Sequence, residues 1–164
     1  MEKLKPSLAE ELKENFKNCI DLANRSVGDK ALVEFDIFYF NNLVNTELID
    51  ENILKPICSN LEDFKNFDDL DEFIKNGLVY HTDIKRETAK DKIMEALYDG
   101  AFIIVCKDFA YIFDTKKFEK RSIGDASTEA SVKNAKDAFI EIANTNLSIV
   151  RRRIKSNNRY KWWW

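Results

Sequence analysis

Two apolar runs near the middle of the chain, separated by only two polar residues, constrain its fold more than any other feature. Residues 101–106 and 109–113 are almost entirely aliphatic or aromatic, and Lys107 and Asp108 stand between them. Short runs of this kind on either side of a two-residue polar break are typical of a β-hairpin. Neither run approaches the roughly 20 apolar residues that a membrane-spanning helix needs. We therefore expect a hairpin within a sheet and no transmembrane segment.

The first third of the chain predicts a helix, a strand and a second helix. Behind a Ser-x-x-Glu capping box, apolar residues recur every three or four positions over residues 8–23, which predicts an amphipathic helix. Alternating β-branched and aromatic residues predict a strand over 31–40. The next helix should be capped by Thr46 and should end near Ile57, because Pro56 disfavours its continuation.

The middle of the chain continues with short elements that glycines separate. Two aspartates open a predicted acidic helix over 68–74, for which Gly77 is the stop signal. A brief strand over 78–84 should follow, and then a helix over 86–99 with Gly100 as its left-handed C-terminal residue.

The C-terminal third predicts an edge strand over 118–123, a polar loop, and a long helix over 134–156. Strands that alternate with helices and end in a hairpin indicate an α/β domain, with a small mixed β-sheet, packed helices and a long C-terminal helix. The expected organisation has three parts: an N-terminal amphipathic helix packed on the domain (1–26), the α/β domain (27–156) and a basic, aromatic tail (157–164).

The charge distribution is asymmetric although the total is nearly balanced. The chain has 26 basic and 29 acidic residues, but residues 148–164 hold six of the basic ones and no acid. Basic residues beside Trp and Tyr suit anionic lipid headgroups or single-stranded nucleic acid, and a basic helix end can also dock on the acidic body of its own chain. The candidate contact residues are Arg153, Lys155, Arg159, Lys161 and Trp162.

Patterns typical of enzymes are weak in this sequence. The single histidine, His81, has no nucleophile or acid at a recognisable spacing, and the four glycines never cluster into a phosphate loop. The acids of residues 68–72 lie at a helix start, where they offset the helix dipole, and Glu34 and Asp36 are most simply a solvated strand face. We predict no catalytic residue, metal site or cofactor. A small hydrolase that uses His81 is the least favoured alternative.

The cysteines and the N-terminus indicate an intracellular protein. Cys19, Cys58 and Cys106 are far apart and have apolar neighbours, as expected for buried free thiols. The first residues lack the apolar core of a signal peptide. We therefore expect the chain in the cytoplasm.

Several segments resemble the N-terminal soluble region of the GerA family, the A subunits of bacterial spore germinant receptors. Residues 40–57 read FNNLVNTELIDENILKPI, similar to the family's strand, turn and helix that ends ILKPL, and residues 97–105 (LYDGAFIIV) are similar to its LLxG segment and apolar strand. Residues 120–129 (KRSIGDASTE) and 133–141 (KNAKDAFIE) resemble its RSIEEPxxE and RGPREGFxE motifs. Residues 144–155 (NTNLSIVRRRIK) resemble its TNxxLIRRRIK motif.

This resemblance covers about residues 31–156 and implies a non-enzymatic first soluble subdomain that takes part in receptor assembly and nutrient-triggered germination signalling. It implies other receptor subunits as partners, together with further copies of the chain, at the cytoplasmic (spore core) face of the inner spore membrane. The alternative is a module that binds nucleic acid or anionic lipid through the basic tail. The resemblance also implies which residues lie at an interface, namely those that match positions of the family's motifs. They are Arg121, Glu129, Asn146, Arg151 and Arg152.

Overall fold

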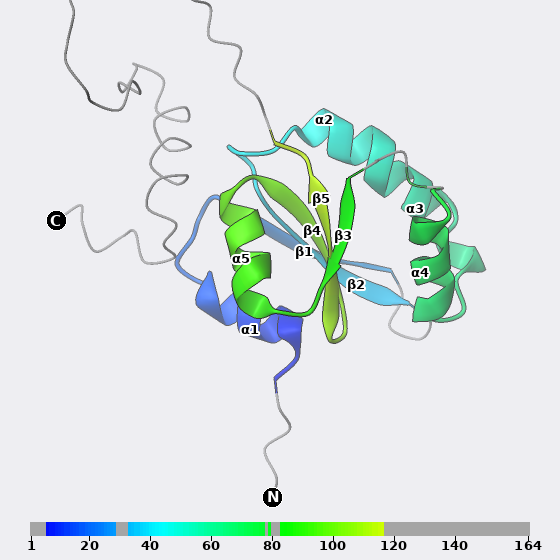
Figure 1. Ribbon diagram of the computed structural model, residues 1–164, viewed down its shortest axis with the longest axis horizontal. Helices are drawn as coiled ribbons and strands as arrows, with labels where there is room; N and C mark the ends of the chain where they lie inside the picture. Colours follow the sequence, from blue (N-terminus) through cyan, green and yellow to red (C-terminus); the bar gives the residue numbers. More distant parts are fainter. Residues whose placement is uncertain (1–5, 29–32, 78, 80–82, 117–164) are drawn as a thin grey trace, which may run out of the picture.

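The computed structural model describes residues 6–28, 33–77, 79 and 83–116. The strands within them are β1 (Leu22–Gly28), β2 (Glu34–Phe40), β3 (Ile84–Glu87), β4 (Ala101–Cys106) and β5 (Phe109–Asp114). The helical segments are α1 (Leu8–Asn15), α2 (Thr46–Leu48), the π-helix η1 (Ile49–Leu54), α3 (Lys55–Ser59), the 3-10 turn η2 (Leu61–Asp63), α4 (Phe67–Lys75) and α5 (Lys90–Tyr98). The strands form one sheet in the order β1-β2-β4-β5-β3, with helices on both faces (Figure 1).

The predicted α/β class, a small sheet with packed helices, is confirmed. The strand pairings described are all antiparallel, however, whereas the sequence favoured a mixed sheet. For two of these pairings the physical reason is that short links join β1 to β2 and β4 to β5, and such links suit only antiparallel neighbours. The predicted strand over 118–123 and the long helix over 134–156 lie outside the described residues. None of the helices within the described ranges is long and apolar enough to span a bilayer.

The predicted hairpin is confirmed as β4 and β5, which occupy the middle of the sheet. Cys106 pairs with Phe109, and Lys107 adopts a positive φ of 51° in the two-residue turn. Every residue of β4 is buried. Its continuous apolar run therefore reflects a strand with neighbours on both sides and helices over both faces.

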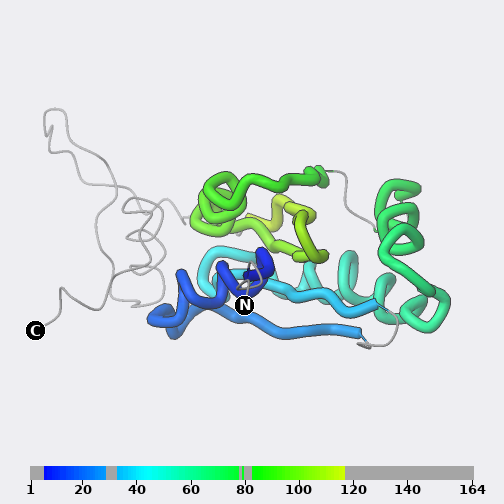
Figure 2. Tube along the Cα trace, turned by 90° about the horizontal axis from the view of Figure 1, so that it is seen from below, coloured from blue at the N-terminus to red at the C-terminus, as the bar shows by residue number. Residues whose placement is uncertain are grey.

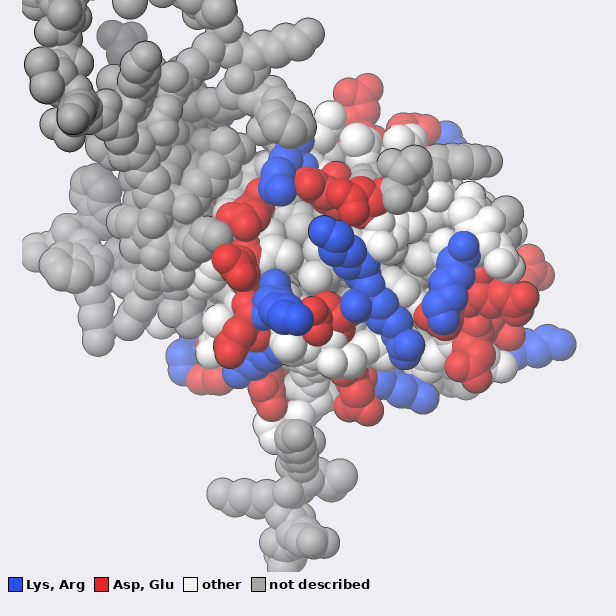
Figure 3. Space-filling model, viewed as in Figure 1, with Lys and Arg blue, Asp and Glu red and all other residues white. Residues whose placement is uncertain are grey.

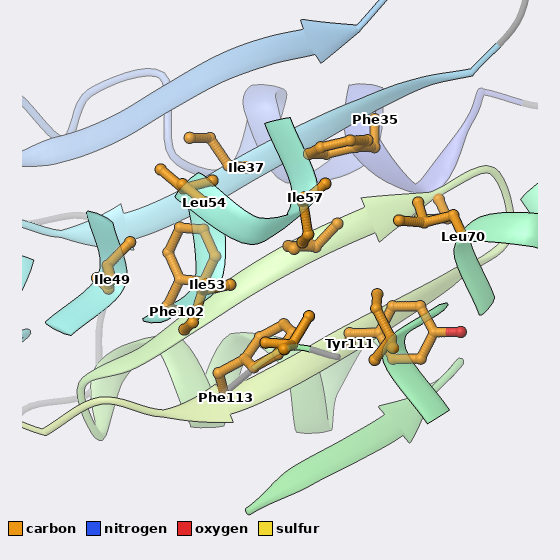
Figure 4. Packing of buried hydrophobic residues seen from close by; sticks show 14 of the residues in the cluster. Phe35, Ile37, Ile49, Ile53, Leu54, Ile57, Leu70, Phe102, Tyr111 and Phe113 are labelled. Atoms are coloured by element: carbon orange, nitrogen blue, oxygen red, sulfur yellow. The ribbon is translucent and has the colours of Figure 1, made fainter. Parts of the chain in front are cut away.

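Residues of β4 point alternately into two hydrophobic clusters. Phe102 and Ile104 belong to the cluster under the helical segments from α2 to α4, and Ile103 and Val105 belong to the cluster under α1 and α5. Figure 4 shows how the first cluster brings side chains of η1, α3 and α4 against β2, β4 and β5. The helix residues labelled there are Ile49, Ile53, Leu54, Ile57 and Leu70. The two clusters give the sheet a hydrophobic layer on each face.

The predicted helix over 8–23 is wrong in its second half. The capping box is present, but α1 ends at Asn15 and the chain then turns to form β1 from Leu22. Phe16 and Cys19 of the predicted apolar face are buried, but Ile20 is 86% exposed and Leu22 is buried instead. Helical spacing and a turn followed by a strand therefore share only part of their buried side chains. The backbone groups along the edge of β2 decide between them, because β1 satisfies their hydrogen bonds. The expected boundary between residues 26 and 27 falls inside β1.

The predicted acidic helix is confirmed as α4. Asn66 caps its N-terminus in a capping box with Asp69, so the acids there do serve the helix start. Gly77 has a positive φ of 73° just after the helix, as its predicted role as the stop signal requires.

The segment between α4 and β4 departs from the prediction. β3 begins at Ile84, the last residue of the predicted strand, and takes in the first two residues of the predicted helix, and α5 begins only at Lys90. Residues 78 and 80–82 of the predicted strand lie outside the described residues. The Glu87 carboxylate accepts hydrogen bonds from the backbone N–H groups of Ala89 and Thr88 at 3.0 and 2.9 Å. These bonds, together with a hydrogen bond from Lys92, lower the pKa of Glu87. Arg86 and Glu87, which helical spacing would have placed in α5, pair instead with Tyr111 and Ala110 of β5.

Candidate interaction surface

An open groove of about 570 Å³ lies where the segment from η1 to α3 meets α4. Most of its lining residues are polar, and one aromatic side chain comes from α4. We call it the α3–α4 groove, and its lining residues are Glu51, Asn52, Lys55, Pro56, Ser59, Asn60 and Phe73.

A π-helical turn shapes this groove. The N–H of Lys55 donates to the carbonyl of Asp50, five residues back. In that pattern the carbonyl of Glu51 would accept the next hydrogen bond from the backbone N–H of residue 56, but residue 56 is proline, which has no N–H. The Glu51 carbonyl therefore lacks that donor within the helix, on a residue that lines the groove. Such π-helical turns occur frequently at functional sites.

The helix ends at Ser59, two residues beyond the predicted end near Ile57. Pro56 lies in the first turn of α3, and the helix continues to Ser59. The π-turn makes this possible, because the wider turn relieves the clash that a proline ring makes in regular α-helix. Asn60 completes the end by donating its side-chain N–H to the Pro56 carbonyl at 2.8 Å. The N-terminal cap is Asn45 in place of the predicted Thr46.

The electrostatics of the groove come from one exposed ion pair. Lys55 Nζ lies 2.9 Å from Glu51 Oε2, and this hydrogen bond and the glutamate charge raise the pKa of Lys55. Both side chains are more than half exposed, so water screens the pair and it adds little to stability. Phe73 packs edge-on against Phe64 with ring centroids 5.2 Å apart. Hydrogen-bonding groups beside an aromatic wall suit contact with another protein surface.

Asp36 is part of a hydrogen-bonded cluster, and its expected role as a solvated strand carboxylate is wrong. Its Oδ1 atom accepts hydrogen bonds from Lys13 Nζ at 2.7 Å and from Ser26 Oγ at 2.6 Å. The Asp36 side chain is only 17% exposed, because α1 lies over this part of the sheet. The cluster joins α1, β1 and β2, so this carboxylate serves to hold the helical layer on the sheet.

Two cationic side chains, Arg86 of β3 and Lys107 of the β4–β5 turn, lie against aromatic rings. Lys85 and Arg86 are exposed on β3, and Figure 3 shows Lys and Arg side chains over this strand with acidic side chains on either side. The Arg86 guanidinium lies 3.9 Å from the centre of the Phe109 ring, and Lys107 Nζ lies 4.5 Å from that of Phe67. Sequence analysis missed these contacts, because 23 residues separate Arg86 from Phe109 and 40 separate Lys107 from Phe67.

The three cysteines differ in their surroundings. Cys19 and Cys106 are buried as predicted, but Cys58 is exposed. Its neighbour Ile57 takes the core-facing position on α3, which leaves Cys58 on the solvent side. Burial raises the pKa of the Cys106 thiol to about 12, and the charge of Asp71 adds to this effect.

We predict that the native thiols react unequally with a disulfide reagent at pH 8. Cys58 should react within minutes, and Cys106 should stay protonated and unreactive until the protein unfolds, because the thiolate is the nucleophile. The absorbance of the released thiolate measures the exposed thiol without denaturant and all thiols with denaturant. A Cys58→Ser variant should lose the fast phase, and a fast phase that survives in that variant would contradict the prediction.

The residues singled out in the sequence as site candidates are not among those the structure describes. This holds for the arginine segment, the tail and His81, so their roles stay predictions. The residues concerned are His81, Arg121, Glu129, Asn146, Arg151, Arg152, Arg153, Lys155, Arg159, Lys161 and Trp162. Within the described ranges, no group of three or more His, Cys, Asp or Glu side chains could hold a metal ion.

Comparison with known proteins identifies similar sequences. The family model described as Bacillus/Clostridium GerA spore germination protein matches residues 10–159. Spore germination protein KA of Bacillus subtilis (strain 168) is 28% identical over 162 residues, covering 94% of this chain and 29% of that protein. Spore germination protein XA of Bacillus anthracis is 23% identical over 148 residues, covering 87% of this chain and 30% of that protein. The chain therefore spans less than a third of the length of these relatives.

A solved structure shares the fold. The crystal structure of the N-terminal domain of the A subunit of the Bacillus megaterium spore germinant receptor GerK3 superposes with a TM-score of 0.61 at 22% identity. The match covers 94% of this chain and 57% of that domain.

Proposed function

This chain belongs to the GerA family of spore germination proteins, and from that membership we propose that it is a non-enzymatic N-terminal domain of a germinant receptor A subunit. In this proposal the domain contributes to receptor assembly and to the nutrient signal that starts germination. The observation that carries the proposal is the family match, which runs through residues 10–159 and so includes both the described sheet and the arginine segment at 151–153.

Contacts among the described residues support a structural role. Lys13 joins α1 to Asp36 of β2, and Lys90 of α5 reaches Glu11 of α1 at 3.1 Å. These ion pairs link the helices on one face of the sheet to each other and to a strand. The α3–α4 groove on the other face leaves hydrogen-bonding groups open to solvent, as a surface that contacts another subunit would.

The proposed partners are the other subunits of the receptor and further copies of this chain, and the proposed location is the cytoplasmic face of the inner spore membrane. Similarity to receptor proteins supports both. The basic tail would lie near anionic headgroups at that surface, where each Lys or Arg contributes about 1 kcal/mol of attraction.

Charge reversal in the arginine segment tests this function. Spores that carry the gene with Arg151→Glu and Arg152→Glu should germinate several-fold more slowly in nutrient, because these positions match the family's arginine motif. The loss of optical density after nutrient addition measures the rate. Affinity purification of the tagged protein should at the same time recover less of the other receptor subunits.

A matched pair of reversals controls for net charge. Lys17→Glu and Lys65→Glu change the same number of exposed cations and should leave germination at the wild-type rate. Normal germination of the arginine variant, together with no recovery of receptor subunits by the wild-type protein, would refute the proposal.

A further inference from the structure

The α3–α4 groove offers several hydrogen-bond acceptors on one helical segment. The carbonyl of Glu51 lacks a donor within the helix, because Pro56 has no N–H and the N–H of Lys55 goes to an earlier carbonyl. Glu51 uses one carboxylate oxygen for Lys55 and keeps the other as an acceptor. Asn60 donates its side-chain N–H to the Pro56 carbonyl, so its side-chain oxygen is left to accept. These acceptors favour a ligand that brings several N–H donors.

An aromatic ring stands among these acceptors. Phe73 of α4 lines the groove, and its contact with the buried ring of Phe64 holds it in place. A guanidinium has five N–H donors and no acceptor, and its flat face stacks on aromatic rings. A lysine ammonium has three donors and holds its water more strongly. The acceptors and the ring together therefore match an arginine side chain better than a lysine side chain.

The surroundings of the groove are acidic. Residues 46–76 contain nine acidic and three basic residues, a net charge of −6, which is twice that of the whole chain. Figure 3 shows acidic side chains gathered over α4, and Figure 2 shows α4 at the end of the molecule away from α1 and α5. The exposed acids of this stretch outside the groove are Glu47, Asp50, Glu62, Asp63, Asp68 and Glu72. A field of this sign attracts a cationic partner and speeds its association.

From these features we propose that the α3–α4 groove binds an arginine side chain of a different subunit of the receptor. The proposal rests on the proposed function and deepens its assembly part by naming the chemistry of the partner. The guanidinium donates to the carbonyl and to the carboxylate of Glu51, and its flat face lies against the Phe73 ring. Lys55 gives way to it, because its ion pair with Glu51 is exposed and screened by water.

Binding of a labelled peptide to the full chain tests the ligand chemistry. The probe is an alanine-rich helical peptide with arginines along one face, and the comparison peptide carries lysines at the same positions. Fluorescence anisotropy should show several-fold tighter binding of the arginine peptide, because only the guanidinium combines the donors with a face that stacks. Equal affinity of the two peptides would mean that net charge alone attracts them and would overturn the proposal. The absence of binding at millimolar peptide would overturn it as well.

A matched pair of substitutions locates the site. Glu51→Gln and Glu47→Gln each remove one exposed charge from the same helical stretch, but only Glu51 lines the groove. Glu51→Gln should weaken binding of the arginine peptide several-fold. Glu47→Gln should leave it nearly unchanged, because salt screens an exposed charge that does not contact the ligand. Equal losses in the two variants would refute the site.

Restoring the missing helical donor tests the role of the Glu51 carbonyl. Pro56→Ala supplies an N–H that can satisfy this carbonyl within the helix and changes no charge. It should weaken binding of the arginine peptide several-fold, and the unfolding midpoint of the variant confirms that it folds. Unchanged affinity would contradict the proposed geometry.

The basic segment of the chain itself is the competing occupant. Arg151→Glu together with Arg152→Glu should leave the affinity for the arginine peptide unchanged if the groove serves a different subunit. A several-fold gain in affinity would mean that the chain's own segment fills the groove, and it would overturn the proposal. These measurements use the purified chain and a peptide, so their failure is distinguishable from failure of the germination test.

Discussion

Replacing Phe102 by alanine should lower the free energy of unfolding by about 3–5 kcal/mol, the range for truncating a buried aromatic side chain. Phe102 is fully buried in the central strand β4, and its ring contacts those of Tyr39 and Phe113 at centroid distances of 5.7 and 5.9 Å. The sheet and the helices on both sides hold this site in place, so little collapse can fill the cavity that the mutation leaves. Urea unfolding followed by circular dichroism measures the change.

Phe73→Ala is the matched control for this prediction. Phe73 is half-buried in the wall of the α3–α4 groove, so its loss should reduce the stability by less than half as much. If both variants lose the same stability, or if Phe102→Ala loses less than about 1 kcal/mol, the packing described for the central strands is wrong.

Replacing Gly100 by alanine should destabilise the protein by about 2–5 kcal/mol, the sum of backbone strain and overpacking. Gly100 has a positive φ of 90°, and an added Cβ would lie 2.8 Å from the backbone oxygen of Leu43 and 3.2 Å from its Cβ. Leu43 is itself fully buried, so neither atom can move away easily. Thermal unfolding of the variant measures the loss.

Gly77→Ala separates the two contributions. Gly77 also has a positive φ, of 73°, but nothing lies within 4 Å of its added Cβ. Its replacement should therefore show the strain alone, about 1–2 kcal/mol. Equal losses at the two positions would mean that the contact between Gly100 and Leu43 does not limit the packing there.

Little of the candidate surface could be predicted from the sequence. The α3–α4 groove depends on how the helix passes Pro56 and on the place where Phe73 of α4 meets it. A proline within an apolar periodic pattern most simply predicts a helix end, but the π-turn before Pro56 lets the helix continue while Ile53 and Ile57 pack in the core. The ion pair of Asp36 with Lys13 was equally hidden, because 23 residues separate the two in sequence.

The sequence by itself determined the elements whose causes are local. The β4–β5 hairpin, the strand β2, and α4 with its acidic start and its stop at Gly77 all follow from patterns within a few residues. The tertiary structure decided the elements at the sheet edges. Residues 22–23 and 86–87 belong to predicted helices, and they become parts of strands because β2 and β5 offer unpaired backbone groups. A buried backbone group must find a partner, and no pattern within one segment records which partner a distant strand supplies.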